Sequence, residues 1–136
     1  MRPLVLSLAL LALAPGAEAQ GPLTATEFDA LTRGRTLLYS SAGRAYGAER
    51  YEAGRKVTWS FLDGDCLSGR WYPQGGLICF AYESPETGPL PPRCWNFHAD
   101  GTGIQAEFPV PGADPELYRA EEAGEDLTCL GPKTGV

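Results

Sequence analysis

His98 is the only histidine in the 136-residue chain, and histidine is the residue that most often serves as a general base. No Gly-x-Ser-x-Gly motif or reactive cysteine–histidine combination accompanies it. It follows Phe97 directly before the turn sequence Ala99-Asp100-Gly101-Thr102, as a residue at the end of a strand would. We therefore interpret His98 as an ordinary strand residue and expect no catalytic residue and no enzymatic activity.

Asp63 and Asp65 flank Gly64 and place two carboxylates close together. A glycosidase pair would need one of these acids in an apolar pocket, and a calcium loop would need a longer series of oxygen ligands than this stretch provides. Asp-Gly-Asp is typical of a turn. We expect a turn here, and we expect no metal and no cofactor.

Arginines recur beside tyrosines in the first half of the chain. The residues concerned are Arg44, Tyr46, Arg50, Tyr51, Arg55, Arg70 and Tyr72. In adjacent antiparallel strands they could form a guanidinium–aromatic patch that holds an anionic or carbohydrate-like ligand. The alternative is that these arginines lie on strand surfaces and pair with Glu49, Glu52 and Glu83.

The segment 84–93 contains four prolines and ends beside Cys94. A stiff, exposed loop loses little conformational entropy on binding, which suits an inhibitor of a secreted hydrolase. Leu90 and Arg93 would then contact the partner. The alternative is an ordinary solvent-exposed loop.

Four cysteines, Cys66, Cys79, Cys94 and Cys129, include no Cys-x-x-Cys pair. Zinc therefore lacks its usual ligand spacing, and an even number of cysteines in an exported chain favours two disulfides. Four cysteines allow three pairings, which spacing does not distinguish. Cys79 and Cys94 lie on strands that we expect to be neighbours, and a bridge between them would leave Cys129 to join the tail to Cys66.

The first 19 residues are typical of a secretory signal peptide. Arg2 precedes an apolar stretch from Leu4 to Leu13, and Ala17-Glu18-Ala19 offers small residues for cleavage. Ten apolar residues are too few to span roughly 30 Å of hydrocarbon, and no cysteine follows for a lipid anchor. We expect a periplasmic or secreted protein with no membrane anchor after signal cleavage.

Residues 20–136 have the length of one domain, with a loose tail from about residue 131. Arg2 and Glu18 cancel, so this part keeps the net charge of −6, and its acidic residues are spread along the sequence. This negative charge argues against nucleic acid and anionic membranes as partners, because both bind basic proteins. We expect the partner to be an unknown small ligand or a secreted protein.

One short helix is expected first, because Thr24 and Glu27 form a capping box and Leu23 can pack on Phe28. Gly34 would end it. Aromatic and β-branched runs separated by glycine turns then predict antiparallel strands. These cover residues 35–41, 44–51, 55–62, 66–72, 77–83, 94–98 and 103–109, and 116–121 is a further strand or a helical turn. The expected fold is mainly β, an antiparallel meander forming a small barrel or a sandwich.

Alternation along these strands puts the aromatic rings on one shared inner face. Three-residue and four-residue turns at 63–65 and 73–76 would pair Leu62 with Cys66 and Trp71 with Ile78. The expected inner face comprises Val57, Trp59, Phe61, Leu67, Trp71, Ile78, Phe80, Tyr82, Trp95, Phe97, Ile104, Ala106 and Phe108. Cys66, Cys79 and Cys94, together with Arg70 and Tyr72, would lie on the outer face.

The stretch Gly69-Arg70-Trp71-Tyr72, followed by Ile78-Cys79-Phe80 and Cys94-Trp95, resembles a class of small exported bacterial proteins of unknown function. The likeness covers about residues 24–108. The resemblance implies a β-rich exported protein and supports a bridge between Cys79 and Cys94, but it implies no activity. Cys66 and Cys129 depart from the two-cysteine pattern of that class.

These features together predict an exported, non-catalytic binding or interaction module. The alternatives are an inhibitor acting through the loop 84–93 and, third, a small enzyme. A small-ligand module predicts a lined cavity inside the barrel, with inward polar groups among the aromatic rings.

Overall fold

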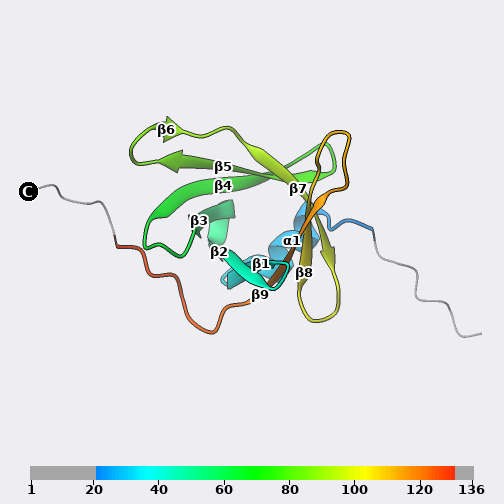
Figure 1. Ribbon diagram of the computed structural model, residues 1–136, viewed down its shortest axis with the longest axis horizontal. Helices are drawn as coiled ribbons and strands as arrows, with labels where there is room; N and C mark the ends of the chain where they lie inside the picture. The colour runs from blue at the N-terminus through cyan, green and yellow to red at the C-terminus, as the bar shows by residue number, and fades with distance from the viewer. Residues whose placement is uncertain (1–20, 131–136) are drawn as a thin grey trace, which may run out of the picture.

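The computed structural model describes residues 21–130, which form an eight-stranded antiparallel barrel with one helix (Figure 1). The expected signal peptide and the tail beyond residue 130 lie outside the described residues. The helix is α1 (Ala25–Thr32), and a 3₁₀ turn, η1, covers Ala53–Arg55. The strands are β1 (Thr36–Ser41), β2 (Arg44–Tyr51), β3 (Lys56–Ser60), β4 (Cys66–Gln74), β5 (Leu77–Ser84), β6 (Gly88–Pro89), β7 (Arg93–Ala99), β8 (Ile104–Phe108) and β9 (Glu116–Glu122).

The barrel follows the order of the chain. Each strand from β1 to β5 pairs with the next, β7 pairs with β5, and β8 and β9 follow. Pairing of β1 with β9 closes the sheet on itself, and the short β6 adds only to the end of β5. The structure therefore decides between the two expected architectures in favour of the barrel. It also makes the segment after Glu116 a strand.

Helix α1 covers one end of the barrel with Phe28. The expected capping box is present, since the Glu27 amide donates to the Thr24 hydroxyl and the Thr24 amide donates to the Glu27 carboxylate. Phe28 is fully buried, and the centre of its ring lies 4.6 Å from that of Phe97 and 5.1 Å from that of Trp71. The helix thus blocks this end, and any opening into the interior lies at the other.

The expected inner face is confirmed. Trp59, Leu67 and Trp71 alternate inward on β3 and β4, and the register continues through Ile78 and Phe80 on β5. Trp71 is 2 % exposed and Trp59 is 9 % exposed, while Trp95 is half-buried. A single consistent alternation therefore places all three tryptophans toward the interior.

Two turns differ from the sequence-based expectation. Trp71 pairs with Phe80, not Ile78, because Gly75 and Gly76 alone form the turn, and both adopt positive φ as a two-residue hairpin turn requires. Likewise Cys66 pairs with Ser60, not Leu62, because the turn spans residues 61–65. Both expected registers were wrong by two residues, which leaves every side chain on its expected face.

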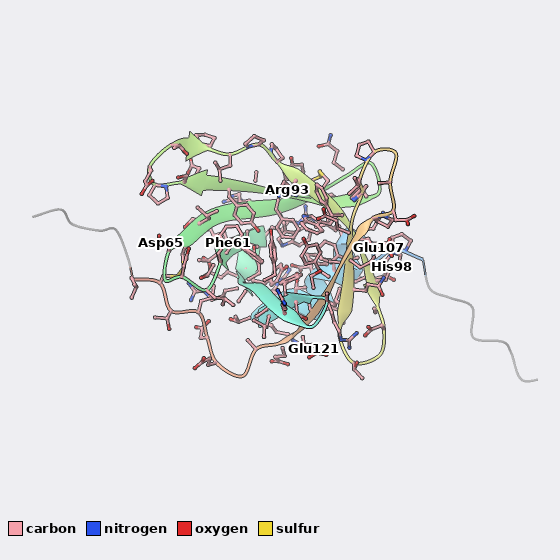
Figure 2. All side chains as sticks on the ribbon, viewed as in Figure 1. Phe61, Asp65, Arg93, His98, Glu107 and Glu121 are labelled. Atoms are coloured by element: carbon pink, nitrogen blue, oxygen red, sulfur yellow. A yellow bond between two sulfur atoms is a disulfide. The ribbon has the colours of Figure 1, made fainter. Side chains whose placement is uncertain are left out.

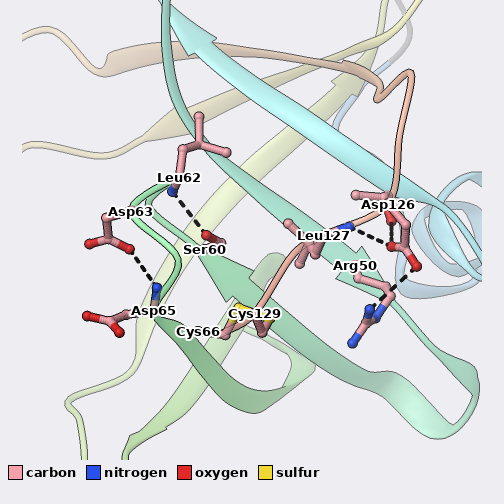
Figure 3. The surroundings of a disulfide bond; sticks show 10 residues. Arg50, Ser60, Leu62, Asp63, Asp65, Cys66, Asp126, Leu127 and Cys129 are labelled. Atoms are coloured by element: carbon pink, nitrogen blue, oxygen red, sulfur yellow. Dashed lines mark hydrogen bonds and ion pairs between the residues drawn. A yellow bond between two sulfur atoms is a disulfide. The ribbon is translucent and has the colours of Figure 1, made fainter. Parts of the chain in front are cut away.

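Two disulfides are present, Cys66–Cys129 and Cys79–Cys94, which is the pairing that follows from placing Cys79 and Cys94 on neighbouring strands. Cys79 and Cys94 lie directly opposite each other on β5 and β7. The bridge from Cys129 to Cys66 brings the segment after β9 back to the start of β4 (Figure 3). Beside it, the Leu130 amide donates to the Gly64 carbonyl at 2.8 Å. Two disulfides indicate an oxidising, extracytoplasmic environment. Within residues 21–130, no helix is long and apolar enough to cross a membrane.

Candidate functional site

The barrel contains a central cavity of about 370 Å³. Its wall is predominantly aromatic. The lining residues are Tyr39, Tyr46, Glu49, Tyr51, Trp59, Phe61, Leu67, Phe80, Tyr82, Leu90, Pro91, Arg93, Trp95, Phe97 and Tyr118. Eight-stranded barrels have an interior that is either filled by side chains or wide enough for one small ligand. In this barrel the side chains leave a cavity large enough for one small ligand.

The floor and the mouth of the cavity are made by different residues. Tyr51, Phe80 and Phe97 contact Phe28 of the covering helix, so they form the floor. At the other end, Phe61 is 51 % exposed and Arg93 is also exposed. The cavity therefore runs from solvent at this mouth down to the residues above α1.

Two glycines make room for the rings of the wall. A Cβ on Gly47 would lie 2.2 Å from the ring of Trp59, and a Cβ on Gly69 would lie 2.8 Å from the ring of Tyr82. Both distances are far below ordinary contact. Each ring therefore crosses a neighbouring strand only because that strand carries no side chain there.

A β-bulge brings Tyr46 into the cavity. On β1, Tyr39 pairs with Gly47 and the next residue, Ser40, pairs with Ala45, which leaves Tyr46 as the additional residue of β2. Such an insertion redirects side chains. The Tyr46 ring consequently lies 5.5 Å from that of Trp59 and 4.9 Å from that of Tyr118, measured between ring centres.

Glu49 is the only carboxylate residue among the lining residues, and it is 1 % exposed. It lies on the inner face of β2, directly opposite Trp59 of β3. The Tyr82 hydroxyl donates to its two carboxyl oxygens at 2.9 and 3.0 Å. Tyr82 reaches it from β5, two strands beyond β3, by crossing over Gly69.

Burial raises the pKa of Glu49 well above its ordinary value, and the hydrogen bond from Tyr82 only partly opposes this effect. No ion pair in the described part of the chain includes Glu49. An isolated buried carboxylate is costly. The side chain therefore keeps its proton well above the pH at which an exposed glutamate loses it.

A second buried polar contact lies beside this carboxyl group. The hydroxyl oxygens of Tyr39 and Tyr51 are 2.6 Å apart and share a hydrogen bond. Burial raises the pKa of both phenols, as it does for Tyr82. These groups are neutral at physiological pH, so the interior carries no fixed charge around Glu49.

Arg93 brings a positive charge to the mouth. It is the first residue of β7, and its pairing with Phe80 places it on the inner face. Its guanidinium carbon lies 4.3 Å from the ring centre of Phe108 and 5.9 Å from that of Trp95. Stacking on two rings restricts where this charge can lie.

The structure divides the predicted binding residues into two groups. Tyr46, Leu90 and Arg93 line the cavity. Arg44, Arg50, Arg70 and Tyr72 do not line it. Arg50 instead lies 3.5 Å from Asp126, on the tail that carries Cys129 (Figure 3).

The predicted arginine–tyrosine patch is divided between the two faces of the sheet, because neighbouring residues of one strand face opposite sides. Tyr46 and Tyr51 lie in the interior, whereas Arg50 lies on the outer face of the same strand. Arg55 stacks on Trp71, with its guanidinium carbon 4.7 Å from the ring centre.

Glu49 is the residue of the candidate site that the sequence analysis missed. The alternative in which Glu49 pairs with an arginine on the strand surface is wrong, because Glu49 is 1 % exposed and forms no ion pair within residues 21–130. Glu49 is two residues before Tyr51 on β2, so the two side chains lie on the same, inner face. The two-residue spacing between Glu49 and the large aromatic Tyr51 could have indicated the inward direction of Glu49. However, Gly47 and Glu49 occupy two of the inward positions of β2, so this strand lacks the apolar alternation that marks an inner face.

His98 does not line the central cavity. Its Nε2 lies 3.6 Å from Glu107 on the neighbouring strand, and Figure 2 shows both side chains together at β7 and β8. Asp63 and Asp65 form the expected turn, in which the Asp65 amide donates to the Asp63 carboxylate at 3.0 Å. Across residues 21–130, no cluster of three or more histidine, cysteine or acidic residues is arranged to hold a metal ion.

Comparison with known proteins identifies no relative of this chain: no family model, no curated protein and no solved structure matches it.

Proposed function

We propose that this protein is an exported binding protein that holds a small, mainly apolar ligand in its central cavity. The observation that carries the proposal is the aromatic cavity of about 370 Å³ that contains a single buried carboxyl group. Concave, mostly apolar sites with a few placed polar groups are the usual form of small-molecule sites.

The shape of the site supports binding inside the barrel. Its floor is fixed by Phe28 and its wall by the disulfide-linked β5 and β7. A rigid, preformed site loses little entropy when a ligand enters. A ligand with a flat apolar body would replace water against the rings of Trp59, Tyr46 and Tyr82.

The polar groups of the cavity support a ligand with one or two polar atoms. Glu49 is buried in the cavity wall beside Tyr82 and can exchange hydrogen bonds with a ligand group that reaches it. Arg93 lies at the opposite, solvent-exposed end. A ligand therefore has one polar contact at depth and another at the mouth.

The proposed location is the periplasm or the external medium, after removal of the signal peptide. The two disulfides and the signal-like sequence of residues 1–19 support it. The resemblance to small exported bacterial proteins, which we also propose, agrees with this location.

We prefer a small-ligand function to inhibition of a hydrolase through the loop 84–93. Leu90 and Pro91 of this loop line the cavity mouth, and the Leu90 amide donates to the Tyr82 carbonyl at 2.9 Å. Part of the loop is thus held along β5. We also prefer it to catalysis, because the cavity lining brings no base or nucleophile beside Glu49 other than neutral phenols.

Binding of the neutral dye N-phenyl-1-naphthylamine tests this proposal. We expect its fluorescence to rise on addition of the protein, because the dye is brighter away from water. Leu67→Trp adds bulk on the cavity wall and should weaken binding at least tenfold. Leu38→Trp is the matched control, because Leu38 is 37 % exposed on the outer face of β1.

Equal dye binding by the wild type and by Leu67→Trp would show that the dye does not enter the cavity. If the wild type binds neither this dye nor any other neutral apolar compound of similar size, the proposed function is wrong.

A further inference from the structure

We propose that the natural ligand is an organic monocation, an ammonium group on an apolar body, which enters the central cavity and forms an ion pair with Glu49. This inference rests on the proposed function and names the ligand class for the same site. It is drawn from the kinds of polar group in the cavity and from their positions.

The first argument is that Glu49 has no positive partner. It is 1 % exposed, and its hydrogen-bond partner is the neutral hydroxyl of Tyr82. A buried acid that is not needed for folding is a costly residue to keep, since an apolar side chain of similar size would pack without desolvating a carboxyl group. A cationic ligand supplies the partner that the chain itself does not.

The second argument is that the interior accepts hydrogen bonds and positive charge. Apart from Glu49, the ionisable side chains that line it are tyrosines and Arg93. The tyrosines are Tyr39, Tyr46, Tyr51, Tyr82 and Tyr118. Phenol oxygens can accept from an ammonium group, and the faces of tyrosine and tryptophan rings attract cations. Trp59, directly opposite Glu49, provides the largest such face.

The third argument concerns the position of Arg93. It is the only basic side chain among the lining residues, and it lies at the mouth, stacked on Phe108, while Glu49 is buried. An anionic ligand would pair with Arg93 at the surface and leave the deep part of the cavity, with its carboxyl group, to an apolar tail. That arrangement does not use Glu49, whereas a cation uses it together with the surrounding rings.

Ion-pair formation requires that Glu49 lose its proton. The carboxyl O–H bond breaks, the proton passes to solvent, and the carboxylate pairs with the ammonium group that the ligand brings in. The titratable groups that face Glu49 are Tyr82 from β5, Tyr39 from β1 and Tyr51 from β2, and none of them titrates near neutral pH, because burial raises their pKa. Below the pKa of Glu49 in the ligand-free protein, one proton is therefore released for each cation bound. Affinity should rise about tenfold per pH unit until the pH reaches the pKa of Glu49.

Three probes with the same ring system test the charge preference: 1-naphthylmethylammonium, 1-naphthylmethanol and 1-naphthoate. Calorimetry at pH 7 on the disulfide-bonded protein gives the affinity of each. We expect the cation to bind at least tenfold more tightly than the alcohol, and the anion to bind most weakly. Repeating the titration in two buffers with different ionisation enthalpies measures the protons released.

Glu49→Gln keeps the size of the side chain and its hydrogen bond with Tyr82, and it should remove the preference for the cation while the alcohol still binds. Glu83→Gln is the matched control, because Glu83 is exposed on the same barrel. It should leave all three affinities unchanged. A thermal melt of each variant confirms that it is folded.

The outcomes separate this inference from the proposed function. If the alcohol binds as tightly as the cation, if the anion binds best, or if Glu49→Gln keeps the cation preference, the ligand class is wrong and the cavity still binds small molecules. If none of the three probes and no neutral dye binds, the proposed function itself fails.

Discussion

Replacement of Glu49 by glutamine should make the protein more stable at neutral pH. The folded protein holds the proton of this carboxyl group more tightly than the unfolded chain does, because burial raises its pKa well above 4.5. Below pH 4.5 both states are protonated, and the group has no effect on stability. Above pH 4.5 only the unfolded chain gains by losing the proton, so stability falls until the pH reaches the pKa in the folded protein.

The size of the effect follows from the width of this pH window. Each pH unit between 4.5 and the pKa of Glu49 in the folded protein costs about 1.4 kcal/mol. Glutamine has no proton to lose, and the variant lacks this slope. For a domain of this size, that energy corresponds to a difference in Tm of roughly 5 °C for each pH unit of this window.

Thermal melts of the wild type and Glu49→Gln across pH 4 to 7 measure the difference. Asp100 and Asp126 have lowered pKa values because of hydrogen bonds from Arg119 and Thr36, so their contribution to stability is lost as the pH falls. That loss is common to both proteins and cancels. Glu83→Gln serves as the surface control. Parallel curves for Glu49→Gln and the wild type over this range would refute the assignment of Glu49 as a buried, protonated acid.

Three further changes test the fold and the cavity wall. Phe28→Ala should cost about 3–5 kcal/mol, because a fully buried ring that contacts four others is lost; urea unfolding measures this, and a loss below 1 kcal/mol would contradict its role as the floor support. Gly47→Ala should cost about 1–3 kcal/mol, because its Cβ would lie 2.2 Å from the ring of Trp59, and near-ultraviolet circular dichroism should report the displaced ring. Replacing Cys66 and Cys129 by serine should cost about 4 kcal/mol, more than the roughly 3 kcal/mol expected for Cys79 and Cys94, since these bridges close loops of 63 and 15 residues; the reverse order of Tm values would show that loop closure does not dominate.

The sequence predicts the strands and the inner face well, because alternation of large rings with polar residues is strong from Val57 to Phe108. An error of two residues in a turn, as at Gly75 and Gly76, changes the pairing but not the face. The closure of the sheet was open from sequence alone, because pairing of β1 with β9 joins segments about 80 residues apart and no local pattern encodes it.

The candidate site was predicted only in part, for a related reason. Tyr46, Leu90 and Arg93 were named for other roles, as members of a surface patch or of a protruding loop, and they meet only once the barrel closes. The burial of Glu49 is hard to predict from sequence, because charged residues are rarely buried. The strand that carries it also contains a bulge and a glycine, which break the alternation that would have shown its direction.

Closure through the first and last strands has a consequence for how the molecule is made. Until Glu116–Glu122 is in place, β1 and β8 both present free backbone donors and acceptors, which other chains can join. The risk of aggregation is therefore greatest in chains that end before this segment. A proteolytic nick or a premature stop there leaves two strand edges unpaired at the same time.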